Sequence, residues 1–488
     1  FFIYDALKDD KPMDRFVSEL ILMRGNINLG GSAGFAMAAD NDVPMAAKAQ
    51  ILGTAFLGVE MQCARCHDSP FHSTTQKDLF QISAMLERKV LVLPKSSTVP
   101  AGFFEKKERE SLIKATLKPN QKIDPAWPFK NIATADVSDQ WLMQKDDARE
   151  KLAAIITLPT NKRFAKVLAN RYWKRLMGAG IVEPAFDWEN KNASHPELLD
   201  WLAHEFVASG YQAKSVIRLI MNSQAYQRES TGHNFTAASD KRFFTAPDKR
   251  RMSAEQVVDS LFQASGRSMK VEEITFDSDS RQPPDRMLNL GVPKRAWEYT
   301  SLSNERDRPS LALPRVQAVT DVLEAFGWRG ARQNPITDRD TSPHILQPAI
   351  LANGTLSSWI SRLSDNSFLT RIALESKTPD ELADEIYLRF LSRFPTADEK
   401  NKVIDMLEPG FVSRIKNPAP SSFVELARLP NISWTNHLVE EATKVKLEME
   451  KRARLGDARS ELLDASWRER VEDIVWAVYN LPEFVWVP

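Results

Sequence analysis

The chain has 488 residues, a length that allows two or three domains, each with its own core. Its 65 Lys and Arg residues balance 65 Asp and Glu residues, so no net charge attracts it to nucleic acid. With 43% hydrophobic and 27% charged residues the composition is that of a globular protein, and no run of about 18 apolar residues predicts a membrane span. We therefore expect neither a nucleic-acid partner nor a transmembrane segment in this chain.

The chain starts at Phe1, without an initiator methionine and without a charged and then apolar leader. We expect that an amino-terminal part of the gene product is missing. The lack of a signal peptide then says nothing about the compartment in which the protein works.

Apolar residues recur at helical spacing along most of the chain, and the 18 glycines are few for its length. Before residue 230 this pattern predicts helices over residues 13–23, 46–66, 79–86, 162–177, 196–207 and 214–226. Beyond residue 250 it predicts helices over residues 252–265, 347–363, 378–391, 396–406 and within 437–485. Two signals mark helix ends sharply: Gly178 stops one helix, and the Ser-x-x-Glu pattern of Ser194 and Glu197 predicts a capping box with Pro196 in the first turn. Trp173, Trp201 and Trp476 lie on apolar helical faces and are predicted to be core residues.

Three segments depart from the helical pattern. Residues 90–93 are β-like, residues 96–146 are rich in proline and carry a charged run at 105–110, and residues 270–343 read mostly as irregular structure. The sequence thus predicts a mainly α, multi-helical protein of two domains with long irregular connections and a minor β excursion. We place the domains at 1–95 and 147–488, with 96–146 as a linker or excursion.

The most informative motif is Cys63-Ala64-Arg65-Cys66-His67, which contains the chain's only two cysteines. Residues three and four apart share one face of a helix, so the two thiols and the imidazole would point the same way. Two thiols at this spacing can add to the two vinyl groups of one haem, and the following histidine then becomes an axial ligand of the iron. The motif therefore predicts haem c on Cys63, Cys66 and His67.

Other uses of the motif stay open. Two thiolates, the imidazole of His67 and a fourth ligand such as His72 could hold zinc, although a second CxxC is missing. A redox-active CxxC requires a strand, turn and helix, which the pattern does not indicate. The two cysteines could also form a buried pair without a cofactor, joined as a disulfide.

The second axial ligand of a haem iron would set its redox potential. Met85, Met61 and His72 are the nearby candidates, and we retain Met85 or His72. Each has a structural explanation, because Met85 lies on an apolar helical face and His72 is only five residues past His67. His195 is a distant candidate whose place in the predicted capping box explains it without iron.

The segment from Gly53 to Phe71, followed by Thr75-Gln76-Lys77-Asp78, resembles the cytochrome-c-like DUF1549 (PSCyt2) domain abundant in planctomycetes. From Asp147 onward the chain resembles the companion DUF1553 (PSD1) domain, with matching pieces such as Asn170-Arg171-Tyr172-Trp173 and Ser194 to Trp201. The opening residues, including Lys11 to Val17, are also similar to the first family. Together these pieces cover most of the chain in the expected order.

The resemblance implies an exported protein, in the periplasm or at the cell surface, often encoded beside a DUF1501 protein. Many relatives read Cys-x-x-Cys-His-x-His, whereas Ser69 occupies the second histidine position here. If that histidine is a ligand in relatives, this chain lacks it unless His72 takes its place. Polar residues of the DUF1553 part could line a site but also fit as caps or buried ion pairs; they are Asn170, Arg171, Asp187, His195 and Glu197.

Three functions compete at this point. The first is an exported c-type haem protein that transfers electrons or takes part in an oxidation with a redox partner protein, such as a DUF1501 family member. The second is a non-catalytic scaffold or binding module for glycans or proteins, in which the Cys/His cluster is structural or binds zinc and exposed tryptophans form the surface. The third, a hydrolase or metal enzyme, has little support because GxSxG, HExxH and P-loop patterns are missing.

Overall fold

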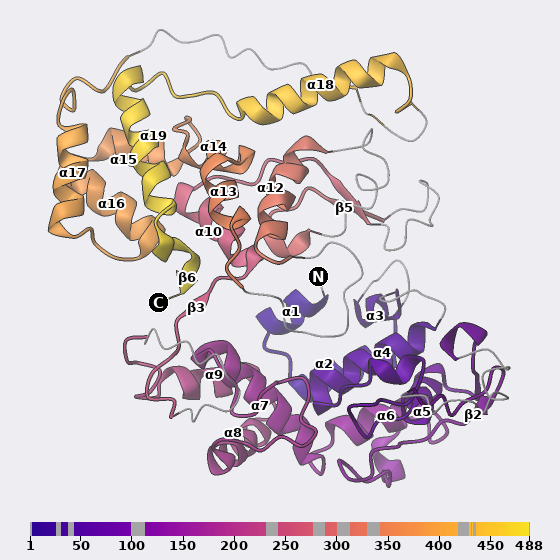
Figure 1. Ribbon diagram of the computed structural model, residues 1–488. Coiled ribbons are helices and arrows are strands. Elements are labelled where there is room, and N and C mark those ends of the chain that lie inside the picture. The colour runs from indigo at the N-terminus through magenta and orange to yellow at the C-terminus, as the bar shows by residue number, and fades with distance from the viewer. Residues whose placement is uncertain are drawn as a thin grey trace. The chain divides into compact units, whose positions relative to one another are not determined.

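The computed structural model describes residues 2–25, 31–37, 43–98, 113–230, 243–276, 288–299, 313–328, 342–417, 429–430, 432 and 436–487 (Figure 1). The chain forms two compact units. One unit spans Phe1–Lys249, and the other contains Arg250–Gln333 and Arg339–Val487. The charged run at 105–110 and large parts of segment 270–343 lie outside the described residues.

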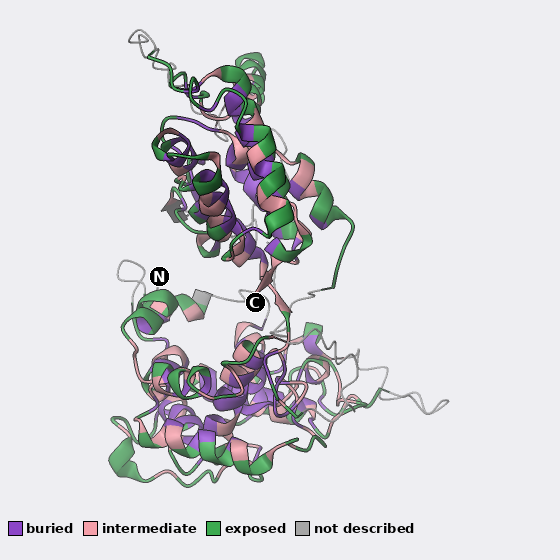
Figure 2. Ribbon diagram, turned by 90° about the vertical axis from the view of Figure 1, so that its left-hand side faces the viewer, coloured by how far each residue is buried: buried purple, intermediate pink, exposed green. Residues whose placement is uncertain are grey.

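The first unit is built from short and medium helices around one apolar core. Its helices are α1 (Phe2–Lys8), α2 (Met13–Leu22), α3 (Gly34–Met37), α4 (Pro44–Leu52), α5 (Gln76–Glu87), α6 (Ala148–Thr157), α7 (Lys162–Met177), α8 (Pro196–Ala208) and α9 (Ala213–Met221). Helix α7 packs against both α8 and α9, while α5 packs against α4 and α6. The buried faces of these helices turn toward one another, as Figure 2 shows, so hydrophobic burial is the main force that joins them.

Local signals explain where several of these helices begin and end. Thr75 accepts the backbone N–H of Asp78, and Asp78 in turn accepts the N–H of Thr75, which makes a complete capping box for α5. Asn161 caps α7 in a similar way, and the same helix stops at Gly178, whose φ of 89° favours glycine. The predicted limits of 162–177 are therefore confirmed, while α5 starts three residues before the predicted 79–86.

The predicted helix over 46–66 is wrong in its second half. Helix α4 continues into the wider π-helical turn η2 (Gly53–Leu57) and stops at Gly58, which has a φ of 62°. Gly58 takes the left-handed conformation in which many helices end, and its backbone also lies against the Trp188 ring. A Cβ atom at position 58 would be only 2.7 Å from that ring, so this contact requires glycine here.

The predicted capping box of Ser194 and Glu197 is also wrong, although a helix does start at Pro196. His195 is the N-cap residue and makes no side-chain capping bond. The Ser194 hydroxyl instead donates to the carbonyl of Ile181, 3.1 Å away, and lies 3.0 Å from the Nδ1 atom of His195. The hydroxyl of Ser194 thus bonds the carbonyl of a neighbouring loop and does not cap helix α8.

The second unit is also helical and has its own apolar core. Its helices are α10 (Ala254–Ser265), α12 (Pro314–Ala325), α13 (Leu346–Asn353), α14 (Thr355–Ser361), α15 (Phe368–Glu375), α16 (Pro379–Leu391), α17 (Ala397–Leu407), α18 (Glu440–Leu455) and α19 (Ala465–Tyr479). Helix α19 packs against α14, α16 and α17. The predicted stretch 347–363 is split at Gly354, and 437–485 is split at Gly456, so each prediction covers two helices.

Strands are minor in the described residues and form three two-stranded antiparallel sheets. The first pairs β1 (Leu91–Val92) with β2 (Lys122–Ile123), which places the predicted β-like stretch correctly. The other pairs are β3 (Arg250–Arg251) with β6 (Trp486–Val487), and β4 (Ile274–Phe276) with β5 (Leu288–Gly291). The mainly helical fold class is confirmed, while the domain limits at 95 and 147 stay a prediction. Of the helices that the structure describes, none combines the length and the apolar character that a membrane crossing requires.

The predicted core role holds for Trp173, which is 5% exposed. It is wrong for Trp201 and Trp476, which are 48% and 43% exposed. The Trp476 indole N–H donates to the carbonyl of Ala352, so this ring covers the end of α13 rather than filling the core. The apolar face of α8 is broader than the area that α7 and α9 cover, which leaves Trp201 at the surface.

Candidate functional site

The CxxCH motif forms one tight turn, η3 (Cys63–Arg65), in the first unit. The backbone N–H groups of Cys66 and His67 both donate to the carbonyl of Cys63, at 3.2 and 3.3 Å. Ala64 is fully buried and anchors the turn, whereas Cys63 is half-buried and Cys66 is exposed. Both cysteines are free thiols, so the disulfide alternative does not describe this structure.

The imidazole of His67 has a defined hydrogen-bonding state. Its Nδ1 atom lies 2.8 Å from the backbone carbonyl oxygen of Asp68. Because a carbonyl only accepts, Nδ1 carries the proton, and a neutral imidazole then has its lone pair on Nε2. This is the arrangement that orients a histidine for metal ligation, with one ring nitrogen fixed by the protein and the other available to the metal.

Asp68 ties the end of the turn to two neighbouring segments. Its backbone N–H donates to the carbonyl of Lys114 at 2.8 Å, and its Oδ1 atom accepts from the N–H of Gln76 at 2.9 Å. The same oxygen also accepts from the hydroxyl of Thr116 at 3.0 Å. The residue that orients His67 is therefore held by the first turn of α5 and by residues 114–116.

The start of the turn is anchored from α4. The side-chain amide of Gln50 is buried and donates to the carbonyls of Met61 and Gln62, at 3.0 and 3.3 Å. These two carbonyls come immediately before Cys63. Buried hydrogen bonds of this kind fix the backbone, because leaving either carbonyl unpaired costs about 1–3 kcal/mol.

The loop before the turn rests on Trp188. The backbone N–H of Trp188 donates to the carbonyl of Gly58 at 2.9 Å, and the indole packs against the Gly58 backbone. On another side the Arg163 guanidinium lies 5.0 Å from the centre of the same ring, a cation–π contact. Burial lowers the pKa of Arg163, which nevertheless stays charged at neutral pH.

His72 is fixed by a cluster of polar groups rather than free to bind iron. Its Nε2 atom lies 2.9 Å from Oδ2 of Asp187, and its Nδ1 atom lies 3.2 Å from the Ser69 hydroxyl and 3.7 Å from Oε2 of Glu60. Ser69 also accepts the backbone N–H of His72 at 3.1 Å. The serine that occupies the second histidine position of the CxxCHxH pattern thus contacts the histidine proposed as its substitute.

The other proposed iron ligands lie in different settings. Met85 is buried on α5, the helix that packs against the CxxCH turn. Met61 is fully buried before the turn and packs against Gly53. His195 lies at the start of α8 against the ring of Phe244, 5.4 Å between ring centres.

Two polar residues named from the sequence are structural. Asn170 is fully buried and pairs with both the N–H and the carbonyl of Val182, at 3.0 and 2.9 Å. The Arg171 side chain donates to the carbonyl of Thr54 at 2.8 Å, which ties α7 to η2. Asp187 joins His72, a pairing across 115 residues that no local pattern could have indicated. Glu197 lies in the first turn of α8, where a negative charge interacts favourably with the helix dipole.

The zinc alternative finds no assembled site in the part of the chain that the structure describes. Among these residues no group of three or more His, Cys, Asp and Glu side chains is placed to hold a metal ion. His72 points its two ring nitrogens at Asp187, Ser69 and Glu60 instead of the thiols. A haem would draw on two thiols and one imidazole nitrogen at this turn, and its attachment to Cys63, Cys66 and His67 stays a prediction.

The fold and this turn define a mainly helical protein with a CxxCH turn in its amino-terminal part. The family model of PSD1, a protein of unknown function (DUF1553), matches residues 148–407, and the chain belongs to this family. The model of PSCyt2, a protein of unknown function (DUF1549), matches residues 1–90, and its name denotes a planctomycete cytochrome-like domain. The resemblance expected from the sequence is confirmed by both models. No curated protein and no solved structure matches the chain.

Proposed function

We propose that this chain is an exported c-type haem protein that carries haem c on Cys63, Cys66 and His67. It serves electron transfer, or an oxidation that a partner protein completes. The observation that supports the proposal most is the state of His67, whose Nδ1–H is fixed by the Asp68 carbonyl while two free thiols lie beside it on one turn. His72, by contrast, has both ring nitrogens engaged by protein groups.

Attachment needs no oxidant. Each thiol adds across one vinyl group, so that a carbon–sulfur bond forms at one vinyl carbon and a hydrogen is gained at the other. The bound haem supplies one-electron chemistry. The protein's own contribution is to hold the turn rigid through Gln50 and Asp68 and to engage Nδ1 of His67 with the Asp68 carbonyl, so that Nε2 is the nitrogen that would ligate the iron.

For the second axial ligand we propose Met85 ahead of His72. Helix α5 packs against the CxxCH turn, and a thioether ligand raises the potential toward values suited to electron transfer. His72 would first have to give up its bond to Asp187 and leave that carboxylate without its partner. Replacing Met85 by leucine should remove the methionine-to-iron charge-transfer band in the far-red spectrum and keep the covalent haem.

The compartment and partners follow from the same chemistry. Haem c is attached outside the cytoplasm, so we place the protein in the periplasm or at the cell surface. An electron carrier requires a redox partner protein, and a DUF1501 family protein is the candidate that the family resemblance suggests.

The test is the mass of the denatured full chain after export in a host that attaches haem c. The expected result is the polypeptide mass plus one haem, together with the absorption spectrum of a thioether-linked haem in alkaline pyridine. Cys63→Ala with Cys66→Ala should abolish the mass gain. His204→Ala, a change at an exposed histidine of α8, should leave it intact. A bare polypeptide mass for the unchanged chain, in a host that loads a known c-type cytochrome, would refute the proposal.

A binding module is the second candidate, because Trp201 and Trp476 are half-exposed rather than buried. In that case the Cys/His turn is structural or binds zinc. The two candidates separate in the same experiment, since a structural turn gives no haem mass, and a zinc site gives a native mass that exceeds the denatured mass by one zinc ion.

A further inference from the structure

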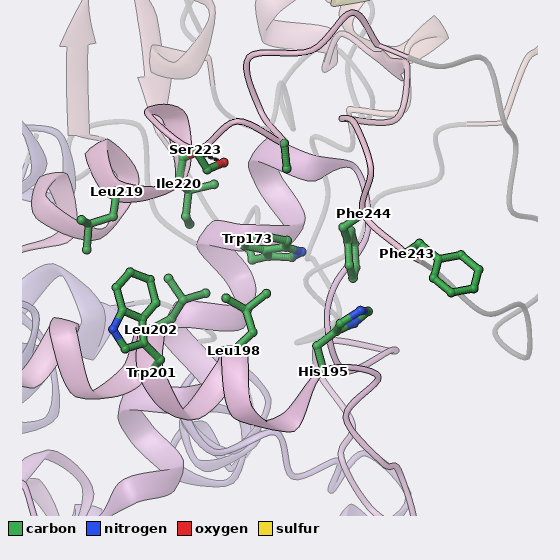
Figure 3. A pocket seen from close by; sticks show the side chains of 11 residues that line it. Trp173, His195, Leu198, Trp201, Leu202, Leu219, Ile220, Ser223, Phe243 and Phe244 are labelled. Carbon is green, nitrogen blue, oxygen red and sulfur yellow. Dashed lines mark hydrogen bonds between the residues drawn. The ribbon is translucent and has the colours of Figure 1, made fainter.

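The first unit contains a cavity of about 270 Å³ between α7, α8 and α9 that no part of the proposed haem site uses. Figure 3 shows the side chains that line it. Aromatic rings dominate the lining, and none of the eleven lining residues is Asp, Glu, Lys or Arg; the principal ones are Trp173, His195, Trp201, Leu219, Phe243 and Phe244. An uncharged, largely apolar ligand therefore suits this cavity.

One polar atom of the residues that line the cavity lacks a hydrogen-bond partner. Trp173 is 5% exposed, and its Nε1 atom has no hydrogen-bond acceptor in the structure. In Figure 3 the nitrogen end of this indole faces Phe244. The two ring centres are 5.1 Å apart and the planes stand at 88°, so the N–H is covered by an aromatic face, which is a weak acceptor. A buried indole N–H usually finds an oxygen partner instead.

Phe244 covers this N–H in an unfavourable backbone conformation. Its φ is 47°, in the left-handed region that bulky residues rarely adopt. Strained residues of this kind gather at ligand sites and switch points. Moving Phe244 away would relieve the strain and expose the N–H of Trp173 to the cavity.

We propose that this cavity binds a small, uncharged aromatic molecule that carries one carbonyl oxygen. The oxygen accepts from the Trp173 N–H in place of the Phe244 ring, and the aromatic body packs between the side chains of Trp201 and Leu219. The volume is slightly below the usual 300–1,000 Å³ of ligand pockets, which limits the ligand to about two fused rings. This site is independent of the haem proposal.

The test compares 1-tetralone with tetralin, two molecules of the same skeleton that differ in one carbonyl group. Both are titrated into the full chain by calorimetry and by NMR of the ¹⁵N-labelled indole N–H groups. Tetralone should shift the Trp173 indole resonance and bind about five- to tenfold more tightly than tetralin, the ratio that one neutral hydrogen bond supplies.

Variants assign the preference to one atom. Trp173→Phe should reduce the tetralone-to-tetralin affinity ratio to about one, while Trp476→Phe, a change in the second unit, should leave the ratio unchanged. Phe244→Ala should increase the affinity for tetralone, because the ring no longer competes for the N–H. The Phe244→Ala variant keeps the proposal testable even if Trp173→Phe does not fold. The proposal is overturned if tetralone leaves the Trp173 resonance unmoved up to its solubility limit, or if the unchanged chain binds both compounds equally. It is also overturned if the tetralone-to-tetralin affinity ratio stays the same in Trp173→Phe, or if Phe244→Ala weakens tetralone binding.

Discussion

Replacing Gly58 by alanine tests whether contact with the Trp188 ring restricts this position to glycine. Gly58 has a φ of 62°, and an alanine there pays about 1–2 kcal/mol for the left-handed conformation. The added Cβ would also lie 2.7 Å from Cγ and Cδ1 of the buried Trp188 ring, and such overpacking costs about 1–3 kcal/mol more. We expect a total loss of about 2–5 kcal/mol in the free energy of unfolding.

Gly210 supplies the matched control, since its φ is 69° and no other atom lies within 4 Å of the position that a Cβ atom would take there. Gly210→Ala should lose only the conformational part, about 1–2 kcal/mol. Urea denaturation followed by circular dichroism measures both variants, and hydrogen exchange of the peptides around residues 43–98 locates the effect. Equal losses for the two variants would show that Trp188 does not restrict position 58 to glycine.

Two further changes test single interactions. Arg393 donates two hydrogen bonds to Glu399, at 2.8 and 2.9 Å, and lowers the pKa of that carboxyl from 4.5 to about 2. The ionised form therefore stabilises the fold above pH 4.5, and this contribution disappears as the pH falls toward 2. Because the pair is partly solvated, Glu399→Gln, which can keep the capping box, should cost about 1 kcal/mol at pH 7 and little near pH 2; a loss that stays constant across this range would contradict the pairing. Asn170→Ala should cost about 2–4 kcal/mol by leaving both backbone groups of Val182 unpaired, whereas the exposed Asn192→Ala should be nearly neutral in the same denaturation assay.

The contrast between α7 and α4 shows which kinds of ends local sequence can specify. The amide of Asn161 and the conformational freedom of Gly178 act within one turn, so both ends of α7 could be predicted. The contact of Gly58 with Trp188 and the hydrogen bond of Ser194 to Ile181 instead join residues that lie 130 and 13 positions apart in sequence. The helical spacing of apolar residues does not show which residues far away in the sequence a side chain will contact.

The amino-acid sequence by itself determined the helical class, most helix positions and the spacing of the two thiols and the imidazole, because helical periodicity, caps and motif spacing are local properties. Only the tertiary structure decided that Asp68 orients the imidazole of His67, that Asp187 holds His72, and that Trp173 lies with an unsatisfied N–H under Phe244. Each of these depends on side chains brought together by burial of the core, and burial is a sum over the whole unit rather than a property of any segment.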